Sequence, residues 1–303
     1  KDQQTNFSYL YSYAVYGPHN MRRVDMTEQQ LREADPQQLL DLLSDLSNIK
    51  HQVLYYGPMS EQDLSALLSK THKTSSELKP VPEGEPFIEQ QATENEVLIA
   101  PYDAKNIYMR MYHNEGRAWN PDEAAVQEVF NEYYGGGMNG IVFQEMREAR
   151  GLAYNAYAYY YTPSQKDRKE YYMTHIITQN DKMVDAVTHF NEILDEMPAS
   201  ETAFQIAKDA VTKRLASSRT TKTGVINAYL SSKKFGLDTS FSELIYKNLD
   251  KVTLQDIVNF EKQTMAKKPY RYIILGDEKE LDMEYLGKIG PIKRLTTDEI
   301  FGY

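Results

Sequence analysis

The two ends of the chain carry the same pattern, and this internal repeat constrains the fold more than any other feature of the sequence. Three pairs of segments match at an offset of 218 or 219 residues: Tyr16-Gly17 with Phe235-Gly236, ADPQQLL (34–40) with VTLQDIV (252–258), and VLYYG (53–57) with YIILG (272–276). A repeat of this length holds a whole α/β subdomain rather than a solenoid unit. The sequence therefore predicts two related subdomains.

The two copies differ in completeness. The second runs from about Pro86 to Gly287, whereas the first shows only its final helices and one strand, from Phe7 to about Ser69. By subtraction we expect roughly 140 residues of sheet and helix before Lys1 in an intact first copy. A chance likeness between two helix–strand–helix units is the alternative.

Local signals divide the chain into elements. The segment KPVPEGEP (79–86) is the best linker candidate, so we expect domains at 1–79 and 80–303. Strands are expected at 52–56, 96–100, 106–112, 152–161, 171–178 and 271–275. Helices are expected at 8–15, 35–47, 60–69, 122–133, 141–150, 182–196, 200–218, 224–235, 241–248 and 254–265. Asp35 with Gln38, and Thr253 with Asp256, have the spacing of a capping box.

Composition excludes several kinds of site. The net charge of −10 argues against a nucleic-acid partner, because phosphate binding needs a basic face. The absence of cysteine excludes disulfides, thiolate metal sites and cysteine nucleophiles. No apolar run approaches the roughly 20 residues that a membrane span needs.

The stretch from Tyr134 to Tyr161 combines a turn, a helix and a strand. Gly135–Gly137 form a run that neither a helix nor a strand interior favours, and we interpret it as the turn between two helices. It could also cradle an anion, but it lacks the Lys-Ser/Thr of a phosphate loop. Asn139 is the expected N-cap of an amphipathic helix that ends before Gly151, after which the residues favour a strand.

The sequence GGGMNGIVFQEMREARGLAY (135–154) resembles the signature of the insulinase/pitrilysin family of zinc metallopeptidases. The resemblance implies an α+β fold of duplicated insulinase-like subdomains, each a mixed or antiparallel sheet packed against helices. In that family two subdomains form each half, and the halves close as a clamshell around a peptide. Residues 86–287 are similar to the last subdomain of the second half, and residues 7–69 to the end of the one before.

The catalytic signature of that family, His-x-x-Glu-His, is missing. The six histidines stand at positions 19, 51, 72, 113, 175 and 189, and no two are one helical turn apart. His175 alone makes no metal site and is expected in the core or opposite a neighbouring strand. The chain therefore resembles the non-catalytic half, with no zinc ligands of its own. The resemblance implies zinc in the intact protein, and as partners a catalytic N-terminal half of the same protein and a peptide substrate.

The resemblance also implies two substrate-binding residues, Arg147 and Tyr154. In the non-catalytic half of such enzymes, an Arg in this helix and a Tyr seven residues later reach into the active site. A fixed guanidinium and a phenol can hydrogen-bond a substrate carbonyl and the oxyanion that develops on it. Read without the resemblance, Arg147 is an exposed cation at a helix C-terminus, and Tyr154 is a tyrosine half-buried on a sheet.

The charged neighbours of Arg147 have simpler interpretations. Arg150 is expected to be a surface cation or an ion-pair partner. Glu145 and Glu148 resemble a paired-carboxylate site, but next to two arginines they are expected to be solvated.

The leading functional hypothesis is a non-catalytic, substrate-enclosing part of a zinc metalloendopeptidase that cleaves unstructured peptides. Alone the chain is expected to bind no zinc and cleave nothing. Within the intact enzyme it would hold extended peptides, for example by strand addition. One rival is a catalytically inactive structural or partner subunit of the same family that acts as a scaffold. Another is an autonomous peptide-binding module. The compartment stays open, with the bacterial periplasm favoured.

Overall fold

The computed structural model describes residues 2–302, which form two compact units. The first unit comprises residues 2–23, 87–218 and 231–302, and the second comprises residues 24–86 and 219–230. The change from the second unit back to the first at Pro86–Phe87 falls at the end of the proline-rich linker. This grouping reflects packing. The division of the chain into domains 1–79 and 80–303 stays a prediction.

A six-stranded mixed sheet forms the centre of the first unit. Its strands are β1 (Glu96–Pro101), β2 (Asn106–His113), β3 (Asn155–Tyr161), β4 (Tyr171–Gln179), β5 (Arg271–Gly276) and β6 (Ile292–Arg294). They lie in the order β3-β4-β2-β5-β1-β6, with β1 parallel to β5 and β6 and the other pairs antiparallel. The expected α+β fold with a mixed sheet is confirmed.

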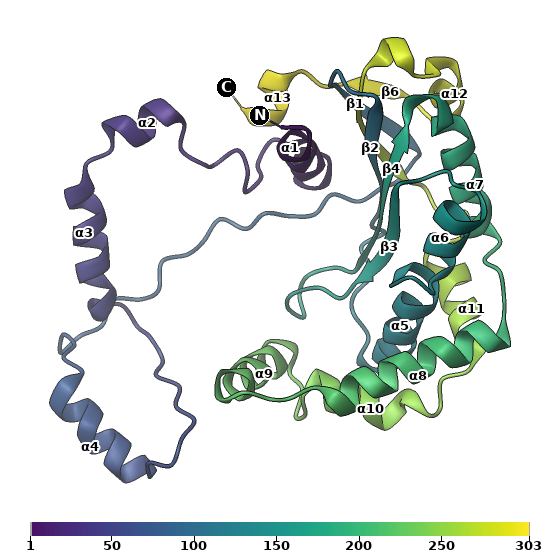
Figure 1. Cartoon of the computed structure of the whole chain (residues 1–303). Helices are drawn as coiled ribbons and strands as arrows, with labels where there is room; N and C mark the ends of the chain where they lie inside the picture. The colour runs from purple at the N-terminus through teal and green to yellow at the C-terminus, as the bar shows by residue number, and fades with distance from the viewer. Residues whose placement is uncertain (1, 303) are drawn as a thin grey trace. The chain divides into compact units, whose positions relative to one another are not determined.

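Helices cover both faces of this sheet (Figure 1). One face packs against α5 (Ala124–Phe130), α6 (Ile141–Phe143), α7 (Met183–Asp195), α8 (Glu201–Ser217) and α11 (Leu254–Thr264). The other face packs against α1 (Gln3–Tyr16) and α13 (Thr297–Phe301). The first unit also contains α10 (Phe241–Leu249), α12 (Met283–Ile289) and the last residues of α9 (Lys222–Phe235).

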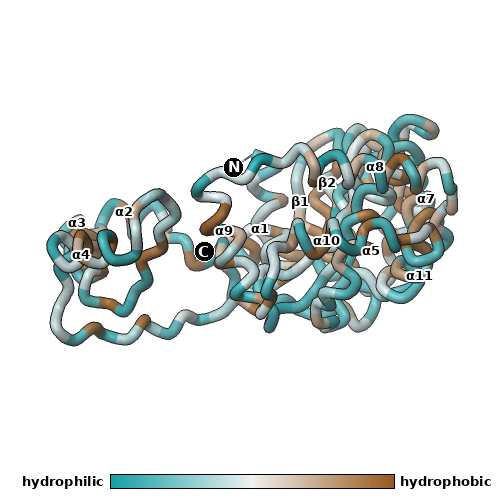
Figure 2. The backbone as a smooth tube through the Cα atoms, turned by 90° about the horizontal axis from the view of Figure 1, so that it is seen from below, coloured by the Kyte–Doolittle hydropathy of each residue, from teal (hydrophilic) through white to brown (hydrophobic). Residues whose placement is uncertain are grey.

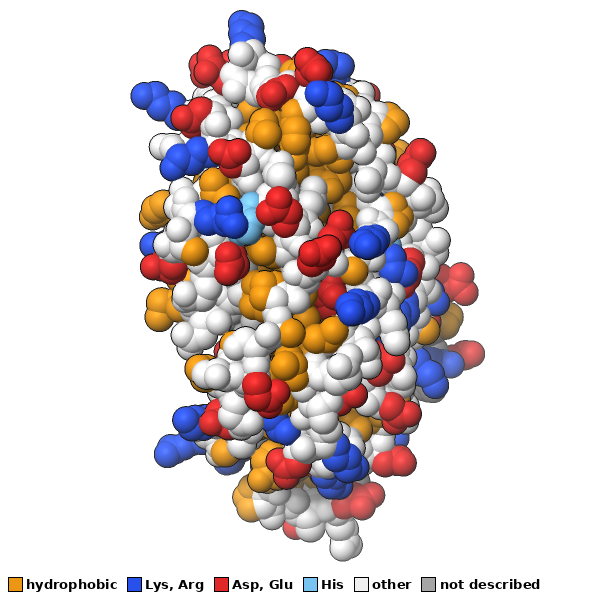
Figure 3. All heavy atoms as spheres, turned by 90° about the vertical axis from the view of Figure 1, so that its right-hand side faces the viewer, with side chains coloured by type: hydrophobic (Ala, Val, Ile, Leu, Met, Phe, Trp, Pro, Cys, Tyr) orange, Lys and Arg blue, Asp and Glu red, His pale blue; other side chains and the backbone are white. Residues whose placement is uncertain are grey.

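The outward side of the helical layer is charged with both signs. Figure 3 shows acidic and basic side chains interspersed over it, with apolar side chains between them. A mixed surface of this kind is typical of a layer that faces water.

The sequence of β5 explains why both faces need helices. Tyr272 and Ile274 belong to the core shared with α5–α8 and α11, whereas Ile273 and Leu275 belong to the core shared with α1 and α13. Successive side chains of a strand point to opposite faces, so an unbroken apolar strand must be covered twice. β5 is such a strand, between β1 and β2.

The second unit contains three α-helices besides the first part of α9. They are α2 (Glu28–Glu33), α3 (Pro36–Asp45) and α4 (Glu61–Thr71). The expected buried strand at Gln52–Tyr56 is absent: these residues have no regular structure and are exposed. A strand is stable only when a neighbour satisfies its amide and carbonyl groups, and no described strand pairs with this segment.

The internal repeat is visible in the helix bounds. α3 begins at Pro36 and α11 at Leu254, 218 residues later. α1 and α9 are both 14 residues long, are offset by 219, and are followed by glycines with positive φ, Gly17 at 77° and Gly236 at 68°.

The two expected capping boxes have different outcomes. The one at Thr253 is confirmed, because Thr253 and Asp256 bond each other's backbone amides. The capping box expected at Asp35 is wrong. Asp35 does cap α3, but its carboxylate accepts from the amide of Gln37 instead of that of Gln38.

Gly135 allows a helix backbone to touch the sheet. It ends a π-helical turn, Asn131–Gly135, that continues α5, and a Cβ atom there would overlap the carbonyl oxygen of Ala158 on β3. Only glycine permits such an approach. The glycine run is therefore fixed by packing as well as by the turn that follows it.

We expect Gly135→Ala to lower the free energy of unfolding by about 3 kcal/mol, because the backbone of β3 cannot move aside cheaply. Gly287→Ala is the matched control: Gly287 lies in α12 with open space around it, so this change should be neutral or stabilise by about 0.5–1 kcal/mol. Urea denaturation measures both values. Equal stabilities of the two variants would contradict the role given to Gly135.

Candidate functional site

The helix that carries Arg147 begins at a glycine and widens along its length. Gly140 is the N-cap, so the expected cap Asn139 is wrong. A Cβ atom at position 140 would crowd the carbonyl oxygen of Gly136, which explains why a glycine occupies the entry. The helix is α-helical over Ile141–Phe143 and π-helical over Gln144–Ala149. Turns of this type occur often at functional sites.

Backbone hydrogen bonds tie the end of this helix to the residues that lead into β3. The Gly151 amide donates to the Arg147 carbonyl at 3.0 Å, and Gly151 adopts a φ of 57°. The carbonyl of Met146 accepts from the amides of Leu152 and Ala153 at 2.8 and 3.1 Å. Gly151 is thus the expected residue that reverses the chain after the helix.

The chain then joins the sheet at Tyr154. Its amide donates to the carbonyl of Ile177 on β4 at 2.8 Å, one residue before β3 begins. The side chain of Met146 is fully buried beneath the helix. These contacts fix the backbone at Arg147 and at Tyr154 relative to each other.

The structure brings the side chains of Arg147 and Tyr154 together. The guanidinium carbon of Arg147 lies 5.9 Å from the centre of the Tyr154 ring and 5.1 Å from that of Phe143. Tyr154 is 78% exposed, and about half of the Arg147 side chain is exposed. Arg147 also lies 3.7 Å from Glu148, a surface pair that contributes little stability. An aromatic ring and a cation are therefore presented side by side to solvent.

The acidic neighbours have separate surroundings. The carboxylate of Glu145 lies 3.4 Å from Nε2 of His189, whose Nδ1 lies 3.0 Å from Glu192. Glu145 therefore faces α7 instead of forming a pair with Glu148. Arg150 is the C-cap residue and is exposed.

A hollow of about 280 Å³ lies beside Tyr154. It is lined by Asn106, Gly151, Leu152, Ala153, Tyr154, Thr178, Gln179 and Lys182. The Lys182 ammonium donates to the Gly151 carbonyl at 3.0 Å, and the Thr178 hydroxyl donates to the Leu152 carbonyl at 2.5 Å. The hollow lies at the ends of β2 and β4, beside the segment that leads into the edge strand β3.

The histidines make no metal centre in the part of the chain that the structure describes. Residues 2–302 contain no cluster of three or more His, Cys, Asp or Glu side chains with the geometry for an ion. His175 is paired across the strands with Tyr157, as expected, with ring centres 5.0 Å apart. Burial, and then the positive charge of Arg110, lower the pKa of His175 to about 4. It is a neutral core residue at physiological pH.

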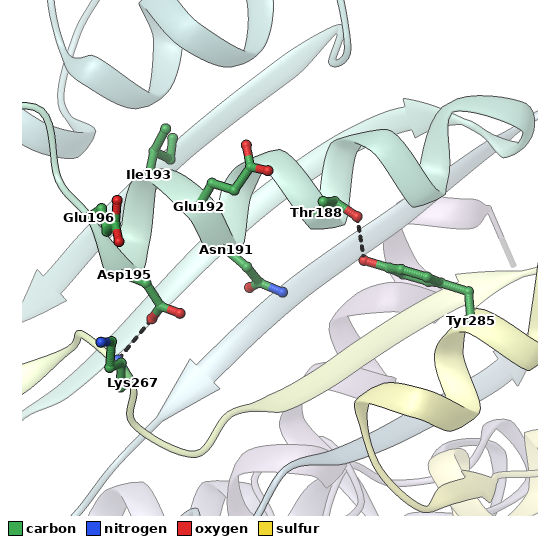
Figure 4. A pocket seen from close by; sticks show the side chains of 8 residues that line it. All are labelled: Thr188, Asn191, Glu192, Ile193, Asp195, Glu196, Lys267 and Tyr285. Carbon is green, nitrogen blue, oxygen red and sulfur yellow. Dashed lines mark hydrogen bonds between the residues drawn. The ribbon is translucent and has the colours of Figure 1, made fainter.

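A second hollow, of about 780 Å³, lies at the end of α7 (Figure 4). It is lined by Thr188, Asn191, Glu192, Ile193, Asp195, Glu196, Lys267 and Tyr285. The hydroxyls of Thr188 and Tyr285 are 2.8 Å apart, and the Lys267 amide donates to Asp195 at 2.8 Å. These residues come from three distant segments, so no local motif predicts them. Neither Arg147 nor Tyr154 lines this hollow.

The chain matches a known family over residues 48–211, more than half of its length. That family is described as "Peptidase M16 inactive domain". The chain belongs to this family. The resemblance to the non-catalytic half of insulinase-like peptidases is thus confirmed. A comparison with curated proteins found no match.

Solved structures share the M16 fold at low sequence identity. The Pseudomonas fluorescens peptidase M16 inactive domain is 17% identical with a TM-score of 0.55, covering 72% of this chain and 52% of that one. The ferredoxin protease FusC, in complex with Arabidopsis ferredoxin, is 12% identical with a TM-score of 0.67. The match covers 91% of this chain and 30% of that one. A chain of Complex III2 from Candida albicans is 16% identical with a TM-score of 0.60. The match covers 96% of this chain and 71% of that one. This M16 chain thus spans about half of the first structure and under a third of the second.

The helices give no sign of a membrane span. None of those described in residues 2–302 combines the length and the apolar character that crossing a bilayer requires.

We expect Arg147→Ala and Tyr154→Phe to leave the free energy of unfolding within about 0.5 kcal/mol, since both side chains are largely exposed. Met146→Ala in the same helix should cost about 2–5 kcal/mol, because that side chain is fully buried. Urea denaturation checks all three variants. A large loss in either of the first two would make Arg147 or Tyr154 a structural residue.

Proposed function

We propose that the chain is the non-catalytic, substrate-enclosing part of an M16 zinc metallopeptidase that acts on unstructured peptides. Membership of the inactive-domain family supports a part of the enzyme that encloses the substrate but has no catalytic groups of its own. The observation that carries the proposal is the exposed pair of Arg147 and Tyr154, held on a rigid backbone at the edge of the sheet. The metal and the catalytic half belong to residues outside this chain.

Arg147 and Tyr154 are suited to bind a peptide carbonyl. A guanidinium offers several donors in a fixed plane, and a phenol offers one donor. Donors held in place before the reaction stabilise the negative charge that develops on the carbonyl oxygen more than they stabilise the neutral substrate. The backbone contacts of Met146 and Ile177 supply that anchoring here.

A scaffold is the second candidate. The likeness to a chain of Complex III2 shows that this fold also occurs inside a multi-subunit assembly, although at 16% identity it speaks for the fold alone. In a scaffold, Arg147 and Tyr154 would contact a partner protein. The sequence of the whole gene product separates the candidates, because a His-x-x-Glu-His helix supports the peptidase and its absence supports the scaffold.

We expect Arg147→Ala and Tyr154→Phe, made in the full gene product, each to lower kcat/KM for an unstructured peptide by about 10²–10³-fold, the usual effect of removing an oxyanion donor. The loss should fall mainly on kcat, because the bonds strengthen as charge develops. The assay is steady-state cleavage of a quenched fluorescent peptide.

Arg150→Ala is the matched control for this assay, since it removes an exposed cation from the same helix end. Its kcat/KM should stay within about twofold of the parent value. Unchanged kcat/KM in both Arg147→Ala and Tyr154→Phe would refute the proposed role. An equal loss in Arg150→Ala would indicate a general effect of charge.

A further inference from the structure

The hollow beside Tyr154 is formed by segments that the sheet brings to one place. Asn106 begins β2, Thr178 and Gln179 end β4, and residues 151–154 lead into β3. Hydrophobic and hydrophilic segments alternate along the chain of the first unit (Figure 2), and the hollow lies where two buried strands reach the surface. Its volume of about 280 Å³ is below the roughly 300–1,000 Å³ of sites for drug-sized ligands, so it suits a single side chain.

The wall of the hollow next to β3 has backbone carbonyls that are already bonded. The Gly151 carbonyl accepts from the Lys182 ammonium, and the Leu152 carbonyl accepts from the Thr178 hydroxyl. Leu152 and the buried Ala153 add apolar surface. A side chain that enters therefore meets few free acceptors, and this disfavours a cation, which can only donate hydrogen bonds.

The formal charge of the hollow has one sign. Among the described residues that line it, Lys182 alone is charged. Its ammonium has three donors, and one of them bonds the Gly151 carbonyl. Within residues 2–302 no carboxylate pairs with Lys182. Two donors thus remain for a ligand, and the exposed carboxamides of Asn106 and Gln179 can add others.

We propose that the hollow beside Tyr154 is a subsite for one acidic side chain of a bound peptide, whose carboxylate is held by the Lys182 ammonium. The proposal rests on the peptide-binding part of the proposed function, because it needs a peptide at Arg147 and Tyr154. Tyr154 lines the hollow and also lies against Arg147, so a peptide bonded to this pair has a neighbouring side chain at the hollow. Lys182 is then a specificity-determining residue, which attracts a carboxylate and repels an ammonium.

The preference for an acidic side chain should be confined to one position of the peptide. Successive side chains of an extended chain point to opposite sides, so the neighbours of the side chain in the hollow point away from it. A general attraction would act at every position instead. The net charge of −10 opposes a general attraction for acidic peptides, so a preference of this sign must come from a local cation.

Lys182 also has a structural role, because its bond to the Gly151 carbonyl helps to hold the reversal of the chain. Loss of that role alone would weaken the binding of every peptide by the same factor. A subsite predicts instead that the effect of a substitution at Lys182 depends on the charge of the peptide side chain. Comparing peptides as well as variants separates the two roles.

A charge scan of one unstructured peptide tests the proposal in the full gene product. The probe is a fluorescein-labelled peptide rich in Ala and Ser, with a single Glu, Gln or Lys placed at each position in turn. Its dissociation constant is measured by fluorescence anisotropy, with EDTA present to prevent cleavage. We expect one position at which Glu binds about fivefold more tightly than Gln, as for a partly exposed ion pair, and Lys more weakly than Gln. This preference should decrease as the ionic strength rises.

Substitutions of Lys182 then test the residue itself. Lys182→Met should abolish the preference for Glu, Lys182→Glu should reverse it in favour of Lys, and Lys182→Arg should keep it. Lys105→Glu is the matched control. It makes the same change of charge at an exposed lysine that adjoins Asn106 in sequence but does not line the hollow, so the preference should stay within about twofold.

Three results would overturn the proposal: no position with a preference for Glu, an equal preference in Lys182→Met and Lys182→Glu, or an equal weakening of all peptides. A failure of every peptide to bind counts as the first of these. Cleavage of the same peptides without EDTA tests the proposed function separately. Cleavage without a preference that depends on Lys182 would reject the subsite and leave the peptidase, whereas such a preference in binding without cleavage would support the subsite and contradict the peptidase.

Discussion

The double burial of β5 is the constraint on which the rest of the structure depends. Its apolar residues alternate between two cores, one completed by α5–α8 and α11 and the other by α1 and α13. A strand with apolar side chains on both faces cannot be left open to water on either, because each large side chain gains about 1.5–3 kcal/mol on burial. The sheet is therefore covered by α1, although 79 residues separate the end of α1 at Tyr16 from the start of β1 at Glu96.

The same packing determines where the candidate site lies. β3 lies directly on the helical layer at Gly135, and the turn that follows leads into the helix of Arg147. The carbonyl of Met146 and the carbonyl of Ile177 then hold the chain at both ends of a short reversal. Arg147 and Tyr154 are exposed, but the backbone beneath them is not free to move. A rigid base under exposed donors is what a preorganised binding site requires.

Much of the fold and of the candidate site could be predicted from the sequence. The β5 pattern and the cap of α11 are local, so the predicted bounds agree with the structure to within a few residues. The N-cap at Gly140 was missed because it depends on the nearby backbone of Gly136. The strand predicted at 52–56 is wrong, because a strand needs partners as well as the propensity of its residues. Arg147 lies close to Tyr154 because the chain reverses at Gly151. A glycine at that position is typical of a helix end, so this reversal could be predicted.

Exposed aromatic residues have two meanings in this chain, and the backbone distinguishes them. The backbone amide of Tyr154 is bonded to β4, so its side chain is exposed from a backbone that is part of the sheet. Tyr56 is also exposed, but it lies in a segment without regular structure whose repeat counterpart is buried. Solvating a large apolar surface costs free energy in both cases. Exposure at Tyr154 thus favours a binding role, whereas exposure at Tyr56 reflects a segment that has no strand partner within residues 2–302.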